Sequence, residues 1–311
     1  MLEPVLNSTH VCSNVQCLDL RPYVRVRDRF HKPNASLERE LEAAMLRDVP
    51  TSSETCPAAM VIACSNTPLG PDNLLRRSVT ALGLPILAPT LPHGLKALRR
   101  HVYLDLLKKL SHCERTAFLL LDSSDSFMRC DANEIAERVR SFGPDTAIVS
   151  AERHFDLQIN PFKGQFDRIT ASLNDSTPYM YVNSGGLGGF HRAMLRFERS
   201  AAGLGPPPFS SRGGFLPDAG KSDQSPVAEV VLRDLLAGNT SSTLDRHTHL
   251  FYTPTMADWD YDRAVARIRH TNPCVVHVPN KMYKSVLWRL WNTTGPNGAP
   301  GVHSNGEPRA R

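Results

Sequence analysis

The stretch "AFLLLDSSDSFM" (residues 117–128) joins a run of apolar residues directly to two carboxylates. Residues 118–121 are apolar, as is typical of a strand buried inside a sheet. Asp122 and Asp125 follow at once and are separated only by serines. A buried strand that ends in two acidic side chains predicts that those side chains bind something at the edge of the sheet.

Strands and helices alternate on both sides of this stretch. Residues 58–65 and 85–90 predict strands, and the segment between them, 74–83, predicts a helix ended by Gly83. The downstream segments predict helices over 131–142, with Asp131 as N-cap, and over 225–238, and strands over 146–152, 249–253 and 273–280. Alternation over ~230 residues predicts a single α/β domain, a sheet wrapped by helices.

Two segments receive more specific predictions. In "HGLKALRRHVYLDLLKKLSH" (93–112), one helical stripe holds Leu95, Leu98, Val102, Leu106 and Leu110. The Lys and Arg side chains are therefore expected on the opposite, solvent side. In 178–200, "PYMYVNSGGLGGFHRAMLRFERS" predicts a strand, a glycine turn and a helix. The Gly/Pro/Ser-rich segment 201–226 is expected to be a long loop.

Residues 1–55 show no sustained period apart from a short helical pattern over 36–49, and they are interpreted as an N-terminal extension. The expected domain therefore covers 56–292, and the Gly/Pro/Asn-rich tail 293–311 is expected to be disordered. With 311 residues, 41% of them hydrophobic, the chain can bury a full core.

The net charge of +5 is modest and spread along the chain, which favours a solvated surface over a nucleic-acid partner. No apolar run approaches the ~20 residues that would span a bilayer, so no transmembrane segment is expected. Five N-glycosylation sequons favour a secretory lumen (ER or Golgi), provided that the N-terminus is incomplete. The first twenty residues resemble no signal peptide, which otherwise favours the cytoplasm. The seven cysteines form no CxxC pair and so predict neither a zinc framework nor a dense disulfide scaffold.

Asp122 and Asp125 have two open interpretations. Two carboxylates three residues apart on a turn can point at one spot, where a hard cation such as Mn²⁺ or Mg²⁺ would relieve their repulsion. They can also be ordinary turn or helix-cap residues. His277, which also follows an apolar strand, is either a third ligand or a structural histidine.

The glycine run and one lysine are further candidates. Asn183, Ser184, Gly185 and Gly186 are predicted to lie on a turn before a helix, where backbone amides could approach a polar ligand closely. Tight packing of strand against helix is the alternative. Lys96 opens the amphipathic helix and is either a phosphate contact or a solvated side chain.

Taken in order, seven motifs resemble the glycosyltransferase domain of procollagen lysyl hydroxylases and its stand-alone relatives, which have a GT-A fold and use UDP-sugars. The motifs are "GLKALRRHVYLDLL", "LLLDSSDSF", "IVSAE", "YVNSGGLGGF", "SDQ", "LDRHTHLF" and "PCVVH". The resemblance implies a GT-A-like mixed sheet flanked by helices. It also implies transfer of a glucose or galactose from a UDP-sugar to a hydroxyl of a protein or glycan acceptor, of which hydroxylysine is one option.

The same resemblance implies roles for individual residues. Asp122, Asp125 and His277 would bind Mn²⁺ (or Mg²⁺), and Asp223 and Asn183 would be catalytic. The implied substrate-binding residues are Ser65, Lys96, Ser184, Gly185, Gly186, Gln224, Asn280 and Lys281.

The chain departs from the family at the acceptor and sugar side. An aromatic cluster is replaced by "RHFDL", a glycine-rich motif by "VPN", and an aspartate run by "KSD". These departures favour the alternative of a non-catalytic GT-A-like module that binds a nucleotide or glycan. The retained Asp122, Asp125 and His277 favour an enzyme. A metal-dependent phosphohydrolase is a third possibility.

Overall fold

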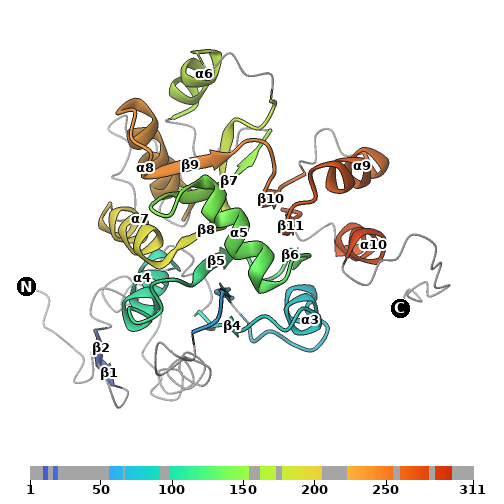
Figure 1. Ribbon diagram of the computed structural model, residues 1–311, viewed down its shortest axis with the longest axis horizontal. Helices are drawn as coiled ribbons and strands as arrows, with labels where there is room; N and C mark the ends of the chain where they lie inside the picture. The colour runs from blue at the N-terminus through green and yellow to red at the C-terminus, as the bar shows by residue number, and fades with distance from the viewer. Residues whose placement is uncertain are drawn as a thin grey trace, which may run out of the picture.

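The protein is a mixed α/β domain built on a six-stranded sheet (Figure 1). The computed structural model describes residues 10–12, 17–19, 56–65, 67–91, 99–153, 162–172, 177–204, 223–254, 260–279 and 284–295. The strand order is β4-β3-β5-β8-β7-β9. The strands are β3 (Ala59–Ile62), β4 (Ile86–Leu87), β5 (Ala117–Leu121), β7 (Ala147–Glu152), β8 (Tyr181–Phe190) and β9 (Ser242–Asp245).

The directions of the strands decide which residues share an edge. β8 runs antiparallel to both of its neighbours, β5 and β7, whereas the other pairs in this sheet are parallel. β5 and β7 therefore end at the same edge, and β8 begins there. Because ligands of α/β sheets bind beyond the carboxyl ends of the strands, this edge is where a site is expected.

A second, three-stranded sheet lies beside the first. It consists of β10 (Phe251–Tyr252), β11 (Val275–His277) and β6 (Ser126–Met128), with β11 parallel to β10 and antiparallel to β6. This register pairs His277 with Ser126, the residue that follows Asp125. A separate antiparallel hairpin joins β1 (His10–Cys12) to β2 (Cys17–Asp19).

Helices cover both faces of the central sheet. Buried residues of α4, α7 and α8 pack with Met60 and Ile62 on one face, and those of α3 and α5 pack with Val61 and Ala63 on the other. Figure 1 shows α5 crossing in front of the strands. The described helices are α3 (Leu74–Ala81), α4 (Arg99–Lys109), α5 (Ala132–Phe142), α6 (Lys163–Ser172), α7 (His191–Gly203), α8 (Gln224–Leu236), α9 (Tyr261–Thr271) and α10 (Lys284–Thr294).

Local signals in the sequence predicted several element ends correctly. Asp131 caps α5, and its side chain accepts from the backbone amides of Asn133 and Glu134. Gly83 follows α3 with a φ of 63°, a backbone conformation that glycine adopts without strain. Helix α10 continues through Thr294, two residues past the expected end of the domain. The helical pattern predicted over 36–49 lies outside the described residues, as does most of the predicted loop.

The predicted glycine turn is wrong, because β8 runs without interruption through the glycines. Side chains from other elements press against this strand and leave no room for a Cβ atom. A Cβ at Gly186 would lie 2.8 Å from Phe251, and one at Gly188 would lie 2.9 Å from both Leu119 and Leu250. The glycines therefore permit close packing on the strand, which was the alternative interpretation of this run.

Two disulfides connect described segments that are distant in sequence. Cys56–Cys113 ties the start of the domain to the turn before β5, and Cys130–Cys274 ties the end of β6 to the start of β11. Cys64 is buried and carries a free thiol. Such cross-links are typical of proteins that mature in an oxidising compartment.

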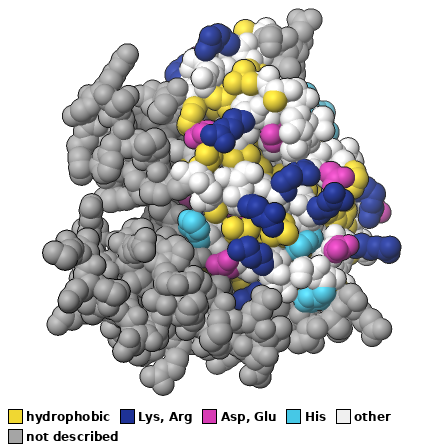
Figure 2. Space-filling view, turned by 90° about the vertical axis from the view of Figure 1, so that its left-hand side faces the viewer, with side chains coloured by type: hydrophobic (Ala, Val, Ile, Leu, Met, Phe, Trp, Pro, Cys, Tyr) yellow, Lys and Arg dark blue, Asp and Glu magenta, His cyan; other side chains and the backbone are white. Residues whose placement is uncertain are grey.

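The surface seen in Figure 2 carries Lys and Arg side chains scattered among Asp and Glu rather than gathered into one continuous basic area. A mixed distribution of this kind is typical of a solvated face. Within the described parts of the chain, no helix has both the length and the apolar character needed to cross a bilayer.

Candidate metal and donor site

The turn between β5 and β6 holds Asp122 and Asp125 at the edge of the sheet. The Asp122 amide donates to the Gly185 carbonyl at 2.9 Å, and the Val278 amide donates to the Asp125 carbonyl at 2.8 Å. The Asn73 side chain donates to the Ser123 carbonyl at 2.7 Å. Backbone contacts from three other segments thus fix this turn, so that it presents its carboxylates in a defined position.

His277 lies beside both carboxylates although about 150 positions separate it from them in the sequence. Its Nε2 atom is 3.6 Å from Asp122 Oδ2 and 3.5 Å from Asp125 Oδ1. The side chain is only 3% exposed, and among the described residues its Nδ1 atom has no hydrogen-bond partner. The structure therefore brings together the three predicted ligands, whose donor atoms lie within 4.8 Å of one another.

The electrostatics of this cluster favour a positive charge. Burial lowers the pKa of His277, but the carboxylates of Asp125 and Asp122 raise it more, so that the net direction is upward. Among the described residues, the Asp122 carboxylate accepts from Arg99 and from no backbone amide. The simple turn interpretation therefore does not account for Asp122.

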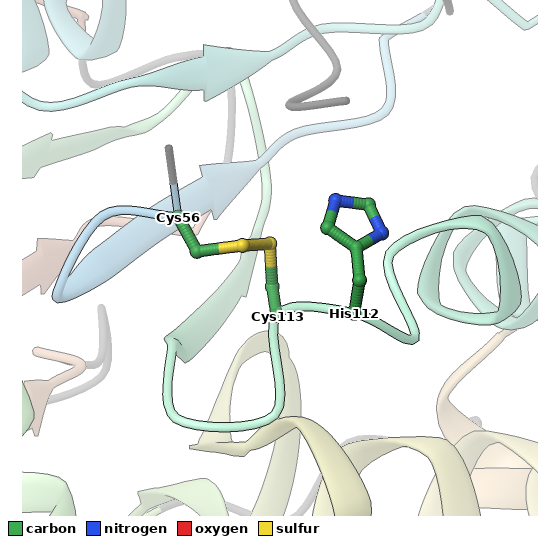
Figure 3. A group of neighbouring side chains, drawn as sticks. All are labelled: Cys56, His112 and Cys113. Atoms are coloured by element: carbon green, nitrogen blue, oxygen red, sulfur yellow. A yellow bond between two sulfur atoms is a disulfide. The ribbon is translucent and has the colours of Figure 1, made fainter. Parts of the chain in front are cut away.

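The other groups of potential metal ligands in the described structure have a different explanation. Figure 3 shows one of them, in which His112 stands beside the bond that joins Cys56 to Cys113. The second group contains Cys130 and Cys274, which form the other disulfide. Sulfur atoms in disulfides are not thiolate ligands, so Asp122, Asp125 and His277 remain the best-fitting set.

Two buried arginines of α4 complete the site, and the sequence pattern misplaced both. The pattern put Lys and Arg on the solvent side, but Arg99 and Arg100 are 7% and 2% exposed. Arg99 Nη1 pairs with Asp122 and lies 3.2 Å from Asp223 Oδ2. Arg100 pairs with Glu198 and Asp223, each at 2.9 Å. Their partners are distant in sequence, so helix periodicity alone gave no signal for their burial.

Asp223 stands at the N-cap position of α8 but does not cap it with its side chain. Its Oδ2 atom receives both arginines, and its Oδ1 atom lies 3.5 Å from the Ser184 hydroxyl. Asp223 and Ser184 are therefore next to the carboxylate–histidine cluster, because Arg99 spans the distance from Asp122 to Asp223.

A second polar cluster lies where β7 ends and β8 begins. The Glu152 carboxylate accepts from Asn183 Nδ2 and from Gln224 Nε2, each at 3.3 Å. Gln224 also donates to the Val182 carbonyl at 2.9 Å. The predicted residues Asn183 and Gln224 thus meet on Glu152, the last residue of the motif "IVSAE", for which the sequence predicted no individual role.

Gly185 and Gly186 do not offer free amides at a helix N-terminus, contrary to the prediction. The Gly185 amide donates to Asn183 Oδ1 at 2.9 Å, and Gly186 pairs with Leu121 inside the sheet. A Cβ at Gly185 would lie 2.1 Å from the His277 ring. The structural role of Gly185 is therefore to leave space for the imidazole.

The remaining predicted residues are less informative. Ser65 is buried just beyond β3, forms an isolated bridge with Thr90, and its hydroxyl bonds to the backbone of Thr67. No described contact links Ser65 to the acidic cluster. Lys96, Asn280 and Lys281 lie outside the described residues.

Comparisons with known proteins give distant structural likeness only. No protein-family model and no curated protein matches the chain, so the resemblance to the procollagen lysyl hydroxylase domain gains no support from them. One similar solved structure is a glycosyltransferase involved in the glycosylation of the major capsid of PBCV-1. It is 16% identical, with a TM-score of 0.43, covering 74% of this chain and 98% of that one. Another is mouse xyloside xylosyltransferase 1 in its apo form. It is 11% identical, with a TM-score of 0.35, covering 79% of this chain and 93% of that one.

Proposed function

We propose that the protein is a metal-dependent glycosyltransferase that moves a hexose from a UDP-sugar to a hydroxyl group. The observation that carries the proposal is the convergence of Asp122, Asp125 and the buried His277, whose Nε2 atom faces both carboxylates at 3.5–3.6 Å. A scaffold has no need of three convergent ligands at the strand edge where α/β proteins bind substrates.

The donor set fits a hard divalent cation. Two carboxylate oxygens and one imidazole nitrogen suit Mn²⁺, or Mg²⁺ with more water in its shell. When bound, such an ion would act as a Lewis acid toward the diphosphate of the donor as UDP departs. Asp122 and Asp125 would hold it from the β5–β6 turn and His277 from β11.

The neighbouring polar residues would bind the sugar and its acceptor. Asn183 and Gln224 meet on Glu152 at 3.3 Å. Asp223 contacts the Ser184 hydroxyl through Oδ1 and Arg99 through Oδ2. Both groups stand at the edge where β7 ends and β8 begins, so a sugar held near the metal would meet hydrogen-bonding groups rather than apolar core. In this scheme Asp223 and Asn183 contact the reacting sugar and its acceptor.

The identity of the donor rests on the ordered motifs of the sequence. Those motifs favour a UDP-activated glucose or galactose, with a protein or glycan hydroxyl as acceptor. The departures near the acceptor side leave collagen-type hydroxylysine as one choice among several. They also keep the second candidate, a GT-A-like module that binds a nucleotide or glycan without catalysis.

The deciding experiment measures UDP release from a panel of UDP-sugars in the presence of Mn²⁺. The enzyme should release UDP from one sugar well above the others, and chelation should abolish release. Binding of UDP without release from any donor supports the non-catalytic module. Release of inorganic phosphate instead of UDP supports a phosphohydrolase.

A further inference from the structure

Arg99 combines features that ordinary surface arginines lack. Its side chain is 8% exposed, and its Nη1 atom is shared between Asp122 and Asp223, which come from different parts of the chain. Its Nε atom is buried, and among the described residues it has no acceptor. The Nε atom of Arg100 is likewise buried without a described acceptor, so what distinguishes Arg99 is its contact with Asp122.

Arg100, the next residue, contacts none of the three candidate metal ligands. Its two terminal nitrogens are engaged by Glu198 and Asp223 at 2.9 Å each, and the second also lies 3.4 Å from the Ser184 carbonyl. None of these partners belongs to the candidate metal cluster. Arg99 is therefore the arginine of the pair that touches a candidate metal ligand.

The two oxygens of Asp122 point to different partners. Oδ1 accepts from Arg99, and Oδ2 lies 3.6 Å from His277 Nε2. An ion bound between Asp122, Asp125 and His277 can use Oδ2 while Arg99 keeps Oδ1. The guanidinium would then stand directly beside the ion.

The surroundings are acidic, since the carboxylates of Asp122, Asp125, Asp223 and Glu152 all lie at this edge of the sheet. A nucleoside diphosphate would be repelled by such a site unless cations faced it. A single divalent ion held by two carboxylates leaves little net positive charge for a diphosphate. A second cation is therefore needed next to the first.

We propose that Arg99 is this second cation, a residue that binds the donor's diphosphate beside the metal and positions Asp122 toward His277. The proposal rests on the proposed function. The planar guanidinium can bond a carboxylate and a phosphate oxygen at once through separate N–H groups, which a lysine ammonium does with much less geometric control.

The test compares the wild type with Arg99→Gln and Arg99→Lys. UDP, UMP and uridine are titrated by calorimetry at saturating Mn²⁺, and Mn²⁺ alone is titrated by electron paramagnetic resonance. Arg99→Gln should weaken UDP by ~10- to 100-fold, the range for a charge-assisted hydrogen bond, and leave uridine unchanged. The UDP affinity of Arg99→Lys should lie between those of the wild type and Arg99→Gln. The control is Arg192, whose side chain is 83% exposed. Arg192→Gln should bind UDP as tightly as the wild type does.

The outcomes separate this inference from the proposed function. A wild type that binds neither Mn²⁺ nor UDP refutes the function. A wild type that binds both, with Arg99→Gln binding UDP equally well, refutes the role of Arg99 and leaves the function standing. If Arg99→Gln fails to fold, Arg99→Lys decides, because it keeps the charge. Unchanged UDP affinity in that variant, or an equal loss for uridine, overturns the proposal.

Discussion

Replacing Gly185 by alanine should impair the proposed metal site without altering any of its three candidate ligands. A Cβ at this position would lie 2.1 Å from His277 Cε1, 2.6 Å from Nδ1 and 2.7 Å from Nε2. Ordinary contact begins near 3.4 Å, so the imidazole must move by at least ~1.3 Å. Metal–ligand distances tolerate only about 0.2 Å, and His277 would therefore leave the coordination sphere.

The expected magnitudes follow from that displacement. Crowding in a packed interior should cost roughly 1–3 kcal/mol of unfolding free energy. Mn²⁺ affinity should fall by at least the ~10- to 100-fold range seen when residues that only orient a ligand are changed. Thermal denaturation measures the first quantity, and electron paramagnetic resonance titration of Mn²⁺ measures the second.

Gly188→Ala provides a matched control within the same strand. A Cβ at Gly188 would crowd Leu119 and Leu250 at 2.9 Å and would not meet His277. This variant should lose stability but keep Mn²⁺ affinity. The double variant Gly185→Ala/His277→Ala should regain stability but not Mn²⁺ affinity. If Gly185→Ala stays folded and binds Mn²⁺ as tightly as the wild type does, His277 is not a ligand.

Three further predictions concern charge and maturation. Asp125→Asn should keep near-normal stability without metal but lose Mn²⁺-dependent UDP binding. Combining it with His277→Ala should reduce UDP affinity by far less than the sum of the two single losses. Unfolding of Asp125→Asn with intact UDP binding would contradict this. Burial raises the pKa of Glu198 to about 7, although Arg100 offsets part of the effect. Because the folded pKa lies above the unfolded one, its contribution to stability is present at about pH 4 and is lost as the pH rises through about 7, so the wild type should lose stability relative to Glu198→Gln over that range; parallel denaturation profiles would contradict it. Protein from its native source should contain both disulfides and carry a glycan on the exposed Asn239. Peptide mapping that finds reduced Cys130 and Cys274 and an unmodified sequon would refute this.

Features governed by neighbouring residues could be predicted from the sequence. The apolar run 118–121 and the aspartates behind it gave β5 and its polar turn, and Asp131 and Gly83 marked helix ends correctly. Each of these depends on contacts within a few residues. The short strands β6 and β9 were not predicted, because their residues lack the length and alternation that mark a strand.

Features governed by distant residues could not be predicted in this way. A glycine run ordinarily indicates a turn, but here it is a strand because His277, Phe251 and Leu250 pack against it from the later part of the chain. Arg99 and Arg100 ordinarily indicate a solvated helix face, but Asp122, Asp223 and Glu198 draw them inside. In both cases the residue type fits two environments, and only tertiary contacts choose between them.

The glycine strand and the buried arginines are two parts of one arrangement. β8 is antiparallel to β5 and β7, so its first residues bring Asn183 and Ser184 to the edge where Asp122 and Glu152 end their strands. For the second sheet to add His277 at the same edge, its side chains must approach β8 more closely than any Cβ allows. The approach concentrates carboxylates in a space that buries Asp223 and Glu152 and half-buries Asp122 and Asp125. Carboxylates removed from water in this way require opposite charges. Arg99 and Arg100 supply part of that charge from α4, and the remaining deficit lies where Asp122, Asp125 and His277 face one another. The position of the proposed cation thus follows from the packing of the two sheets.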